Sequence, residues 1–411
     1  MEKIEKTLNY YKNILKQINR NAYYYLLGNL FSGFGFSAFS LLFNIYLKSL
    51  NIGESKIGNL LSIGTFTTAL LILPAAYIVK RTDVKKFFII SPILTVTGYF
   101  LAIQSSTFQL RIFGFVLAGI AGAFTSVIGG PFIMSVSDSV TRTFLFSLSQ
   151  ATMLAAGISG NLVSGFLPNI IKKFGFSEVQ SLKYAIFFHL LFVIISLFFF
   201  SKIKMKRIYN SSFKDKVKFN TNLKILFYLI LPPLIIGLGA GMTIPFLNIY
   251  FRTIFHLSPS TIGIIFSIAQ LLTILGSLLS PLFAKKFGLI NTIIITQLVS
   301  IPFLFILGFS SLFPLVLTSF FLRNALMNMA SPLSTNFSLE IVDSEDRPFA
   351  SGLLSLAWLA SWGLTANFGG YFIEKSGYRI PFTFTILCYF TSSILYLILL
   401  KPLEKKIKTS K

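Results

Sequence analysis

Charged residues, and acids above all, are scarce in this chain. Only 12% of the 411 residues are charged, and 13 Asp and Glu stand against 36 Lys and Arg. Hydrophobic residues make up 54% of the chain and include 47 Phe. A soluble protein of this size needs more polar surface than this composition provides, which excludes the two or three soluble domains that length alone suggests. The composition predicts a membrane protein.

Cysteine and histidine are almost absent. Cys388 is the single cysteine, and His189 and His256 are the two histidines, so neither a disulfide framework nor a cysteine metal cluster can form within the chain. The apolar runs hold no paired carboxylates, and no phosphate-binding loop of the form GxxxxGKS or GxxxxGKT occurs. We therefore expect no enzyme, no metal site, no cofactor and no ATP-driven transport by this chain alone.

Long apolar runs are what the chain has in abundance. A membrane-spanning helix needs about 20 apolar residues, and twelve runs satisfy this requirement. They cover residues 22–48, 56–79, 87–105, 108–133, 143–168, 183–201, 225–252, 260–284, 289–309, 312–336, 348–373 and 380–400. The predicted fold class is an all-α membrane protein with twelve transmembrane helices.

The twelve runs fall into two blocks of six, 22–201 and 225–400, which we expect to form two six-helix bundles. A basic linker, 202–224, joins the blocks, and a basic tail, 401–411, ends the chain. In the N-terminal segment, 1–21, apolar residues recur at helical spacing beside lysines. This pattern predicts an amphipathic helix that lies on the membrane surface.

The two blocks repeat each other at an offset of 205 residues. The pair Ile57-Gly58 matches Ile262-Gly263 at this offset. The triplet Asn44-Ile45-Tyr46 recurs as Asn248-Ile249-Tyr250, one position out of step. Because six spans is an even number, the repeats run parallel, and a cavity is expected between the two bundles.

Lys and Arg concentrate in the N-terminal segment, the linker, the tail and the connections on the same side of the predicted spans. By the positive-inside rule these parts face the cytoplasm, so both termini are expected there, in a multi-pass protein of the plasma (inner) membrane. The net charge of +23 then reports topology and contact with anionic lipid, and we expect no nucleic-acid partner. We expect a monomer in the lipid bilayer.

The connection after the second span carries a motif. Residues 76–86 read AYIVKRTDVKK, and Arg81 with the trailing Lys85 and Lys86 fits the basic positions of the motif GxxxDRxGRK. Together with the twelve spans, the parallel repeat and the basic linker, this motif resembles the major facilitator superfamily, in its bacterial type, over essentially the whole chain. The resemblance implies an alternating-access transporter in which spans 1, 4, 7 and 10 line a central cavity.

Charged residues at the cytoplasmic ends of both blocks are candidate gate residues. An ion pair that forms when this face closes and breaks when it opens shifts a two-state equilibrium by about 1–3 kcal/mol. The alternative is that these charges are solvated and only set the topology. The candidate gate residues are Arg81, Lys85, Asp138, Arg142, Lys285, Lys286, Asp343 and Arg347.

Arg323 is the only charge near the middle of a predicted span. A charge at that depth is costly unless it faces water or a partner, so it marks a candidate substrate-binding site. Asn324 and Asn328 continue a polar stripe on the same helix. Stripes on other spans add further substrate-binding candidates, Gln150, Gln270, Trp358 and Trp362. A carbonyl-capping arginine and interhelical hydrogen bonds are the structural alternatives.

These features favour transport of a small organic solute, secondary active or facilitative, by alternating access between the bundles. All 13 acids fall in loops, tails or span ends, so proton coupling would need His189 or a carboxylate on the substrate. If Arg323 faces the cavity, it favours an anionic or polar solute. The alternative is multidrug-type efflux of lipophilic compounds, which the many aromatic residues suggest and the missing acids weaken. A scaffolding or sensing role is also open.

Overall fold

The computed structural model describes residues 18–204, 221–343 and 346–404, and every regular element within these ranges is helical. The predicted amphipathic helix, most of the linker and most of the tail lie outside the described residues. The first half contains α2 (Arg20–Ser49), α3 (Glu54–Arg81), α4 (Val84–Gln104), α5 (Phe108–Val136), α6 (Ser139–Lys172) and α7 (Glu178–Ser201). The second half contains α8 (Leu223–Thr243), η1 (Ile244–Phe246), α9 (Leu247–Ile254), α10 (Pro259–Phe287), α11 (Leu289–Phe309), α12 (Phe313–Ile341), α13 (Arg347–Ser376), α14 (Arg379–Leu395) and η2 (Tyr396–Leu400).

These elements form twelve helical rods of membrane-spanning length. Eleven stretches in the described part of the chain are both long and apolar enough to cross a membrane. The remaining rod, α12, has 29 residues, but Arg323, three asparagines and several hydroxyl residues make it more polar. The seventh rod runs through α8, η1 and α9, and the twelfth runs through α14 and η2. The prediction of an all-α fold with twelve transmembrane helices is confirmed.

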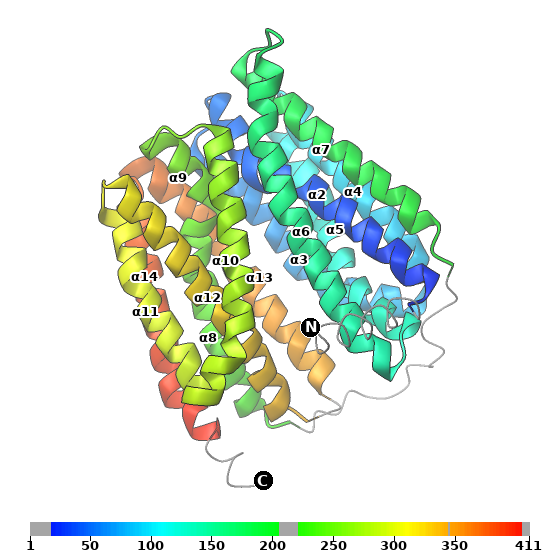
Figure 1. Ribbon diagram of the computed structural model, residues 1–411, viewed down its shortest axis with the longest axis vertical. Helices are drawn as coiled ribbons and strands as arrows, with labels where there is room; N and C mark the ends of the chain where they lie inside the picture. The colour runs from blue at the N-terminus through cyan, green and yellow to red at the C-terminus, as the bar shows by residue number, and fades with distance from the viewer. Residues whose placement is uncertain (1–17, 205–220, 344–345, 405–411) are drawn as a thin grey trace, which may run out of the picture.

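The rods form two bundles that lie side by side (Figure 1). The blue-to-green helices α2 to α7 make one bundle, and the green-to-red helices from α8 onward make the other. The bounds of α4 and α11 differ by 205 residues at both ends, and so do the bounds of α5 and α12. The bundles are therefore parallel structural repeats, as the sequence repeat predicts.

The two ends of the molecule differ in how the bundles meet. We name the end where α2 begins and η2 stops the termini end, which is the lower end in Figure 1, and the opposite end the far end. Near the far end α3 packs on α13 at Gly58 and Gly370, and α10 packs on α6 at Gly263 and Gly165. A Cβ atom on Gly58 would lie 2.5 Å from the carbonyl oxygen of Ala366. The repeated glycines thus permit backbone-to-backbone contact between the halves.

Two buried asparagines of the repeated triplet join the bundles near the far end. Asn44 of α2 donates through Nδ2 to the carbonyl oxygen of Pro245 at 2.7 Å, and Asn248 of α9 donates to that of Leu41 at 2.9 Å. Asn44 Nδ2 also lies 3.3 Å from Asn248 Oδ1. The side chains are only 5% and 2% exposed, so the two amides satisfy each other and the facing backbone away from water. We refer to Asn44 and Asn248 as the asparagine latch.

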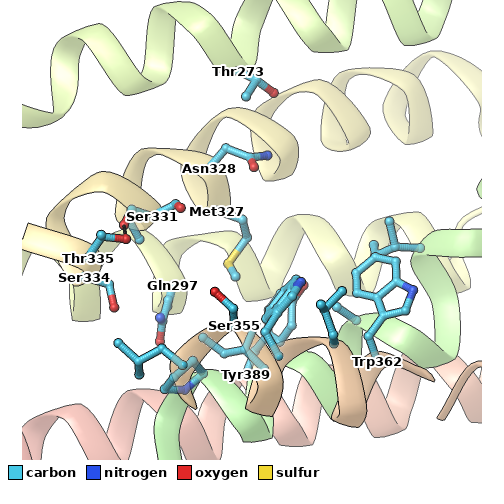
Figure 2. Close-up of a pocket in the computed structure, with 18 of the residues that line it drawn as sticks. Thr273, Gln297, Met327, Asn328, Ser331, Ser334, Thr335, Ser355, Trp362 and Tyr389 are labelled. Carbon is cyan, nitrogen blue, oxygen red and sulfur yellow. Dashed lines mark hydrogen bonds between the residues drawn. The ribbon is translucent and has the colours of Figure 1, made fainter. Parts of the chain in front are cut away.

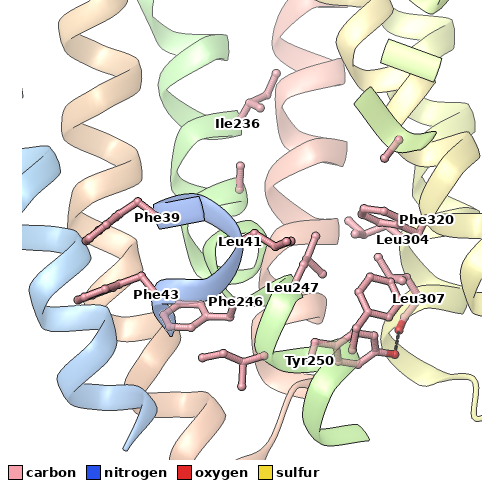
Figure 3. Close-up of a cluster of buried hydrophobic side chains, with 14 of the residues drawn as sticks. Phe39, Leu41, Phe43, Ile236, Phe246, Leu247, Tyr250, Leu304, Leu307 and Phe320 are labelled. Carbon is pink, nitrogen blue, oxygen red and sulfur yellow. Dashed lines mark hydrogen bonds between the residues drawn. The ribbon is translucent and has the colours of Figure 1, made fainter. Parts of the chain in front are cut away.

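An apolar cluster surrounds the asparagine latch. Figure 3 shows Phe39, Leu41 and Phe43 of α2 in one buried cluster with Phe246 and Leu247 of the second half. The seventh rod switches to a 3₁₀ turn at η1, which contains a proline that cannot donate a backbone hydrogen bond. The far end is therefore closed by a packed apolar interface between the first and seventh rods.

The tyrosines of the repeated triplet fix each bundle internally. The hydroxyl of Tyr46 donates to the carbonyl oxygen of Ile103 at 3.0 Å, and that of Tyr250 donates to the carbonyl oxygen of Leu307 at 2.6 Å. These buried bonds tie the first rod to the third and the seventh rod to the ninth. The repeated triplet thus supplies one contact between the halves and one contact within each half.

Both ends of the linker are attached to their own bundle. At its start, the backbone of Lys204 and the side chain of Asn21 exchange two hydrogen bonds of 2.8 and 3.0 Å. At its end, the backbone N–H of Thr221 donates to Asp346 Oδ2 at 2.6 Å. The linker therefore leaves each bundle from a defined position at the termini end.

Candidate functional site

A cavity of about 830 Å³ belongs mainly to the second half of the chain. The first half contributes Ile72 of α3 and Ser126 of α5, and among the described residues α2 contributes none. The expected contribution of span 1 is therefore not found, because its far part is packed into the asparagine latch. The second half contributes Pro233, Ile236, Ala240, Ile244, Gln270, Thr273, Gln297, Arg323, Asn324, Met327, Asn328, Ala330, Ser331, Ser334, Thr335, Ser338, Leu354, Ser355, Trp358, Leu359, Trp362, Tyr389 and Tyr396.

Arg323 is the one charged residue among those that line the cavity in the described part of the chain. It is 5% exposed and donates a hydrogen bond through Nη2 to the hydroxyl of Tyr389. Its Cζ lies 5.5 Å from the ring centroid of Tyr389, which holds the guanidinium against this ring. The Nε atom is buried and has no hydrogen-bond partner. A charged residue that lines the cavity therefore keeps a buried donor without a partner.

Arg111 shows what a purely structural buried arginine looks like in this fold. It is 6% exposed, and it donates to the carbonyl oxygens of Ala102 at 2.9 Å and Ser105 at 2.5 Å. Both carbonyls belong to the C-terminal end of α4, where a cation is favoured by the helix dipole. Arg323 makes no such carbonyl contact in the described structure, so the capping alternative does not explain it.

The α12 side of the cavity is polar. Asn324 donates through Nδ2 to Ala269 O at 3.1 Å and to Thr273 Oγ1 at 2.8 Å, which joins α12 to α10. Farther along α12, Asn328 and a row of hydroxyl groups reach Ser338 near the termini end. Figure 2 shows Asn328, Ser331 and Thr335 on this side, and Ser334 lies 2.7 Å from the hydroxyl of Tyr396.

Aromatic side chains form the opposite side. Trp358 and Trp362, one turn apart on α13, have ring centroids 5.6 Å apart and planes inclined at 44°. Figure 2 shows Trp362 with Tyr389 of α14 across the cavity from the α12 residues. Both tryptophans are half-buried. The cavity thus combines one cation, a row of neutral polar groups and an aromatic wall, which suits an amphipathic molecule.

The structure brings together most of the predicted substrate-binding residues. Arg323, Asn324, Asn328, Gln270, Trp358 and Trp362 all line this cavity. Gln150 does not. It lines a second cavity of about 230 Å³ inside the first bundle, with Tyr25, Asn29, Ser32, Phe87, Phe88, Ser91, Pro92, Thr95, Thr125, Ile128, Gly129, Ser149, Met153 and Phe200.

Gln297 and Tyr389 are cavity residues that sequence reasoning missed. Gln297 of α11 is 1% exposed and accepts a hydrogen bond from Ser393 at 3.1 Å. It is the amide side chain nearest the middle of the apolar run 289–309, and a polar residue at that depth in a membrane helix could have indicated a site. Tyr389 carries no comparable signal, because buried tyrosines are frequent in this chain.

The predicted gate residues of the first half lie at the termini end. The Cζ atom of Arg81 lies 4.2 Å from the ring centroid of Tyr77. Asp138 accepts hydrogen bonds from the backbone and hydroxyl of Thr141 at 2.7 and 2.8 Å. Lys85 and Arg142 lie in the first turns of α4 and α6. The contacts of Arg81 with Tyr77 and of Asp138 with Thr141 thus lie within the first bundle.

The gate residues of the second half show the same pattern. Asp343 exchanges hydrogen bonds of 3.2 and 3.4 Å with Thr221, and Arg347 donates through Nε to Val342 O at 3.4 Å. Lys285 and Lys286 lie in the last turn of α10. A gating role for these eight residues stays a prediction.

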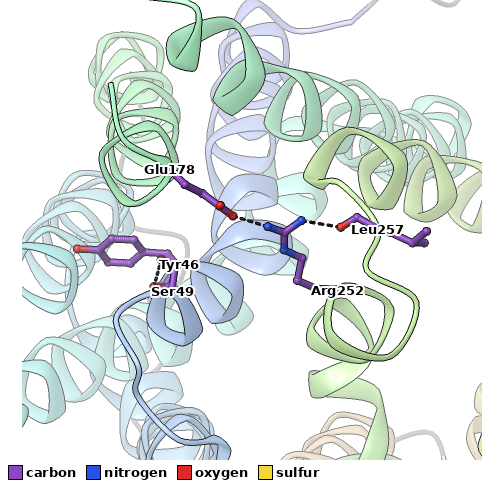
Figure 4. A network of polar contacts seen from close by, with 5 residues as sticks. All are labelled: Tyr46, Ser49, Glu178, Arg252 and Leu257. Carbon is purple, nitrogen blue, oxygen red and sulfur yellow. Dashed lines mark hydrogen bonds and ion pairs between the residues drawn. The ribbon is translucent and has the colours of Figure 1, made fainter. Parts of the chain in front are cut away.

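Two ion pairs lie at the far end. Arg252 of α9 forms an ion pair with Glu178 of α7 in the other bundle and donates to Leu257 O at 2.9 Å (Figure 4). Lys48 and Glu54, which flank the first connection, are 2.7 Å apart. The far end is thus closed by charge contacts at its rim and by the asparagine latch beneath them.

His189 lies inside the first bundle and lines neither cavity. It is fully buried, its Nδ1 lies 2.9 Å from Ala185 O, and its Nε2 lies 3.0 Å from Ser164 Oγ. Its ring stacks on Phe34. Both ring nitrogens have local partners, as in a packing residue.

The sequence model of the Major Facilitator Superfamily matches residues 25–232 and 229–411. A search of curated protein sequences found no match. Similar solved structures include a bacterial homologue of the human lysosomal transporter Spinster (14% identity, TM-score 0.73, covering 92% of this chain and 95% of that chain). They also include a D-xylose–proton symporter (13%, 0.74, 92% and 96%) and the human organic anion transporter MFSD10 (14%, 0.63, 92% and 99%). At these identities the structures establish the fold alone. On the family match, this multi-pass membrane protein belongs to the major facilitator superfamily of transporters, not to an enzyme family.

Proposed function

We propose that this protein carries a small organic anion across the membrane by alternating access, as a secondary active or facilitative transporter. The observation that carries the proposal is Arg323. It is a buried charge with an unpartnered Nε–H on the wall of a cavity of about 830 Å³.

The charge balance of the cavity favours an anion. A buried arginine at the centre of a membrane helix costs about 2.5–3.5 kcal/mol or more. The described acids occupy helix ends and connections, and no carboxylate of the described chain lines the cavity beside Arg323. An anionic solute supplies the missing countercharge through charge-assisted hydrogen bonds, whereas a cation is repelled.

The position of the closed end supports alternating access. The asparagine latch and its apolar cluster close the far end, whereas the cavity follows α12 toward the termini end as far as Ser338. Transport then requires that the latch opens while the termini end closes. We propose that Arg81, Lys85, Asp138, Arg142 and their counterparts Lys285, Lys286, Asp343 and Arg347 form the contacts of the second closed state.

We further propose that the termini end faces the cytoplasm in a plasma (inner) membrane. Lys and Arg concentrate at this end, as the positive-inside rule requires. The far end then faces outward, and the structure corresponds to an inward-facing state. One of the similar solved structures, the bacterial Spinster homologue, is itself described as inward-facing and occupied. We propose that the chain acts as a monomer, because one chain supplies both bundles of the cavity.

The similar structures include a carrier of the proposed substrate class. The human transporter MFSD10 is described as an organic anion transporter. At 14% identity this likeness shows that the same fold can carry organic anions, and it does not identify a substrate for this chain.

Efflux of lipophilic compounds is the second candidate. The aromatic wall of Trp358, Trp362, Tyr389 and Tyr396 favours it. The lone positive charge of Arg323 disfavours the lipophilic cations that many such carriers export.

The deciding experiment is a thermal-shift screen of the detergent-purified protein, followed by uptake into proteoliposomes. The panel contains organic anions, amino acids, neutral sugars and lipophilic cations, and a ligand of the folded state raises the melting temperature. We expect stabilisation and uptake with anions, loss of both in Arg323→Ala, and partial retention in the charge-preserving control Arg323→Lys. Stabilisation by lipophilic cations that is equal in wild type and Arg323→Ala would reject the proposal in favour of efflux.

A further inference from the structure

We infer that the substrate is an aromatic organic monoanion, such as an arylalkyl carboxylate, with its carboxylate at Arg323 and its ring against Trp358 and Trp362. This inference rests on the proposed anion transport and names the substrate class for the same cavity. It follows from the chemistry of two groups that line this cavity, Arg323 and the tryptophan pair.

The anionic end is defined by the geometry around Arg323. The ring and hydroxyl of Tyr389 hold the guanidinium by a cation–π contact of 5.5 Å and a hydrogen bond through Nη2. The remaining donors include the buried Nε–H, which has no partner. A guanidinium fixed in this way matches the two oxygens of a carboxylate. Because Arg323 is the one charge on the described cavity wall, it balances a single negative charge rather than two.

The aromatic end is defined by the two tryptophans. Their ring planes are inclined at 44°, so the two indoles present differently oriented faces to the cavity. Ile236, Leu354 and Leu359 also line the cavity and add apolar surface. Aromatic rings prefer offset-stacked or edge-to-face partners, so this pair favours a flat ring over a saturated one of the same size.

The contrast with the first bundle supports this assignment. At the repeat offset of 205 residues, Trp358 and Trp362 correspond to Met153 and Gly157 of α6, and Arg323 corresponds to Ala118. The first bundle therefore lacks the cation and both indoles, and its own cavity measures about 230 Å³. The combination of a charge with an aromatic pair is specific to the second half.

The chain offers a direct binding assay. It contains only two tryptophans, and both line the cavity, so intrinsic tryptophan fluorescence reports on this site. The purified full-length protein is titrated with phenylbutyrate, with cyclohexylbutyrate, which keeps the carboxylate and loses the aromatic ring, and with phenylbutyramide, which keeps the ring and loses the charge.

We expect saturable quenching by phenylbutyrate with an affinity at least about tenfold higher than that of either analogue. Arg323→Gln should remove the preference for the acid over the amide. Trp358→Leu and Trp362→Leu should each remove part of the preference for the phenyl over the cyclohexyl ring. Ligand binding to these two variants is measured by thermal shift. Met153→Leu, at the repeat-related position in the first bundle, is the matched control and should leave all affinities unchanged.

The contrary results distinguish failure of the aromatic substrate class from failure of the proposed anion transport. Equal affinities for phenylbutyrate and cyclohexylbutyrate would reject the aromatic class and leave anion transport standing. Equal affinities for phenylbutyrate and phenylbutyramide would reject both the aromatic substrate class and the proposed anion transport. If none of the three binds saturably to the folded protein, the aromatic class is rejected, and Arg323-dependent uptake of other anions decides separately whether the proposed transport holds.

Discussion

The two bundles share one backbone plan and hold cavities of different size and chemistry. Helices α5 and α12 have the same length and corresponding bounds, yet α5 has Ala118 and Gly119 where α12 has Arg323 and Asn324. The cavities measure about 230 Å³ in the first bundle and about 830 Å³ beside the second. The comparison teaches that a few side chains, placed on a repeated scaffold, concentrate the candidate site in one half.

The interface between the halves shows the opposite behaviour, because there the repeat is kept. Gly58 and Gly263 take repeat-related places in the two bundles, and so do Asn44 and Asn248. Each asparagine donates to a backbone carbonyl of the other half. A two-fold relation between the bundles requires matching contacts on both sides, whereas substrate binding does not.

The largest expected effect comes from Arg323→Ala, which gives α12 the residue found at the corresponding place in α5. We expect anion affinity to fall about 100-fold, or roughly 2.7 kcal/mol, because the charge-assisted hydrogen bonds are lost. The melting temperature without ligand should stay equal or rise, because the variant no longer buries an unpaired charge. Fluorescence titration and a thermal melt measure the two quantities. A large drop in the unliganded melting temperature with unchanged affinity would show that Arg323 is structural.

The next effect concerns the asparagine latch. Asn248→Ala leaves the buried carbonyl of Leu41 without its donor, which costs about 1–3 kcal/mol in the state closed at the far end. The population open at the far end should rise about 5- to 150-fold. Maleimide labelling from the far side, at a cysteine introduced by Ile244→Cys in a Cys388→Ala background, measures this population.

The matched control for the latch is Asn169→Ala. Asn169 donates to Ser260 across the same interface at 3.0 Å, but at an exposed position where water replaces the lost bond. Labelling should therefore change little. Equal labelling of the two variants would contradict a special role for the buried pair.

A smaller effect is expected from Glu178→Gln at the rim of the far end. Exposed ion pairs contribute about 0.2–1 kcal/mol, so labelling of the same reporter cysteine should rise by no more than about fivefold. High salt should reduce the difference. The double variant Glu178→Arg with Arg252→Glu should restore the wild-type value, and failure to do so would mean that the pair does not stabilise closure.

The smallest effect is expected from Gln150→Ala. Gln150 lines the cavity of the first bundle and not the cavity that contains Arg323. The affinity for the anion should therefore change less than about twofold, because a substitution away from a binding site has a small effect. Gln270→Ala is the contrasting variant, because Gln270 lines the large cavity. A loss of affinity in Gln150→Ala as large as that in Gln270→Ala would place both residues around one substrate.

Much of the candidate site was predictable from residue types in apolar runs. A polar or charged side chain inside a membrane helix is costly, and this reasoning selected Arg323, Asn324 and Asn328, which line one cavity. The same reasoning selected Gln150, and Gln150 lies elsewhere. Periodicity shows that residues share a face of one helix, but it does not show which neighbour that face meets.

The sequence by itself determined the membrane class, the twelve spans and the two parallel repeats, because bilayer thickness and backbone hydrogen bonding leave few other folds for such apolar runs. Only the tertiary structure decided that the site belongs mainly to the second half, that Arg323 rests on Tyr389, and that Asn44 and Asn248 lock the far end. These features depend on contacts between residues 66 to 204 positions apart. Such contacts follow from how rods pack against one another, and no local pattern in one rod encodes them.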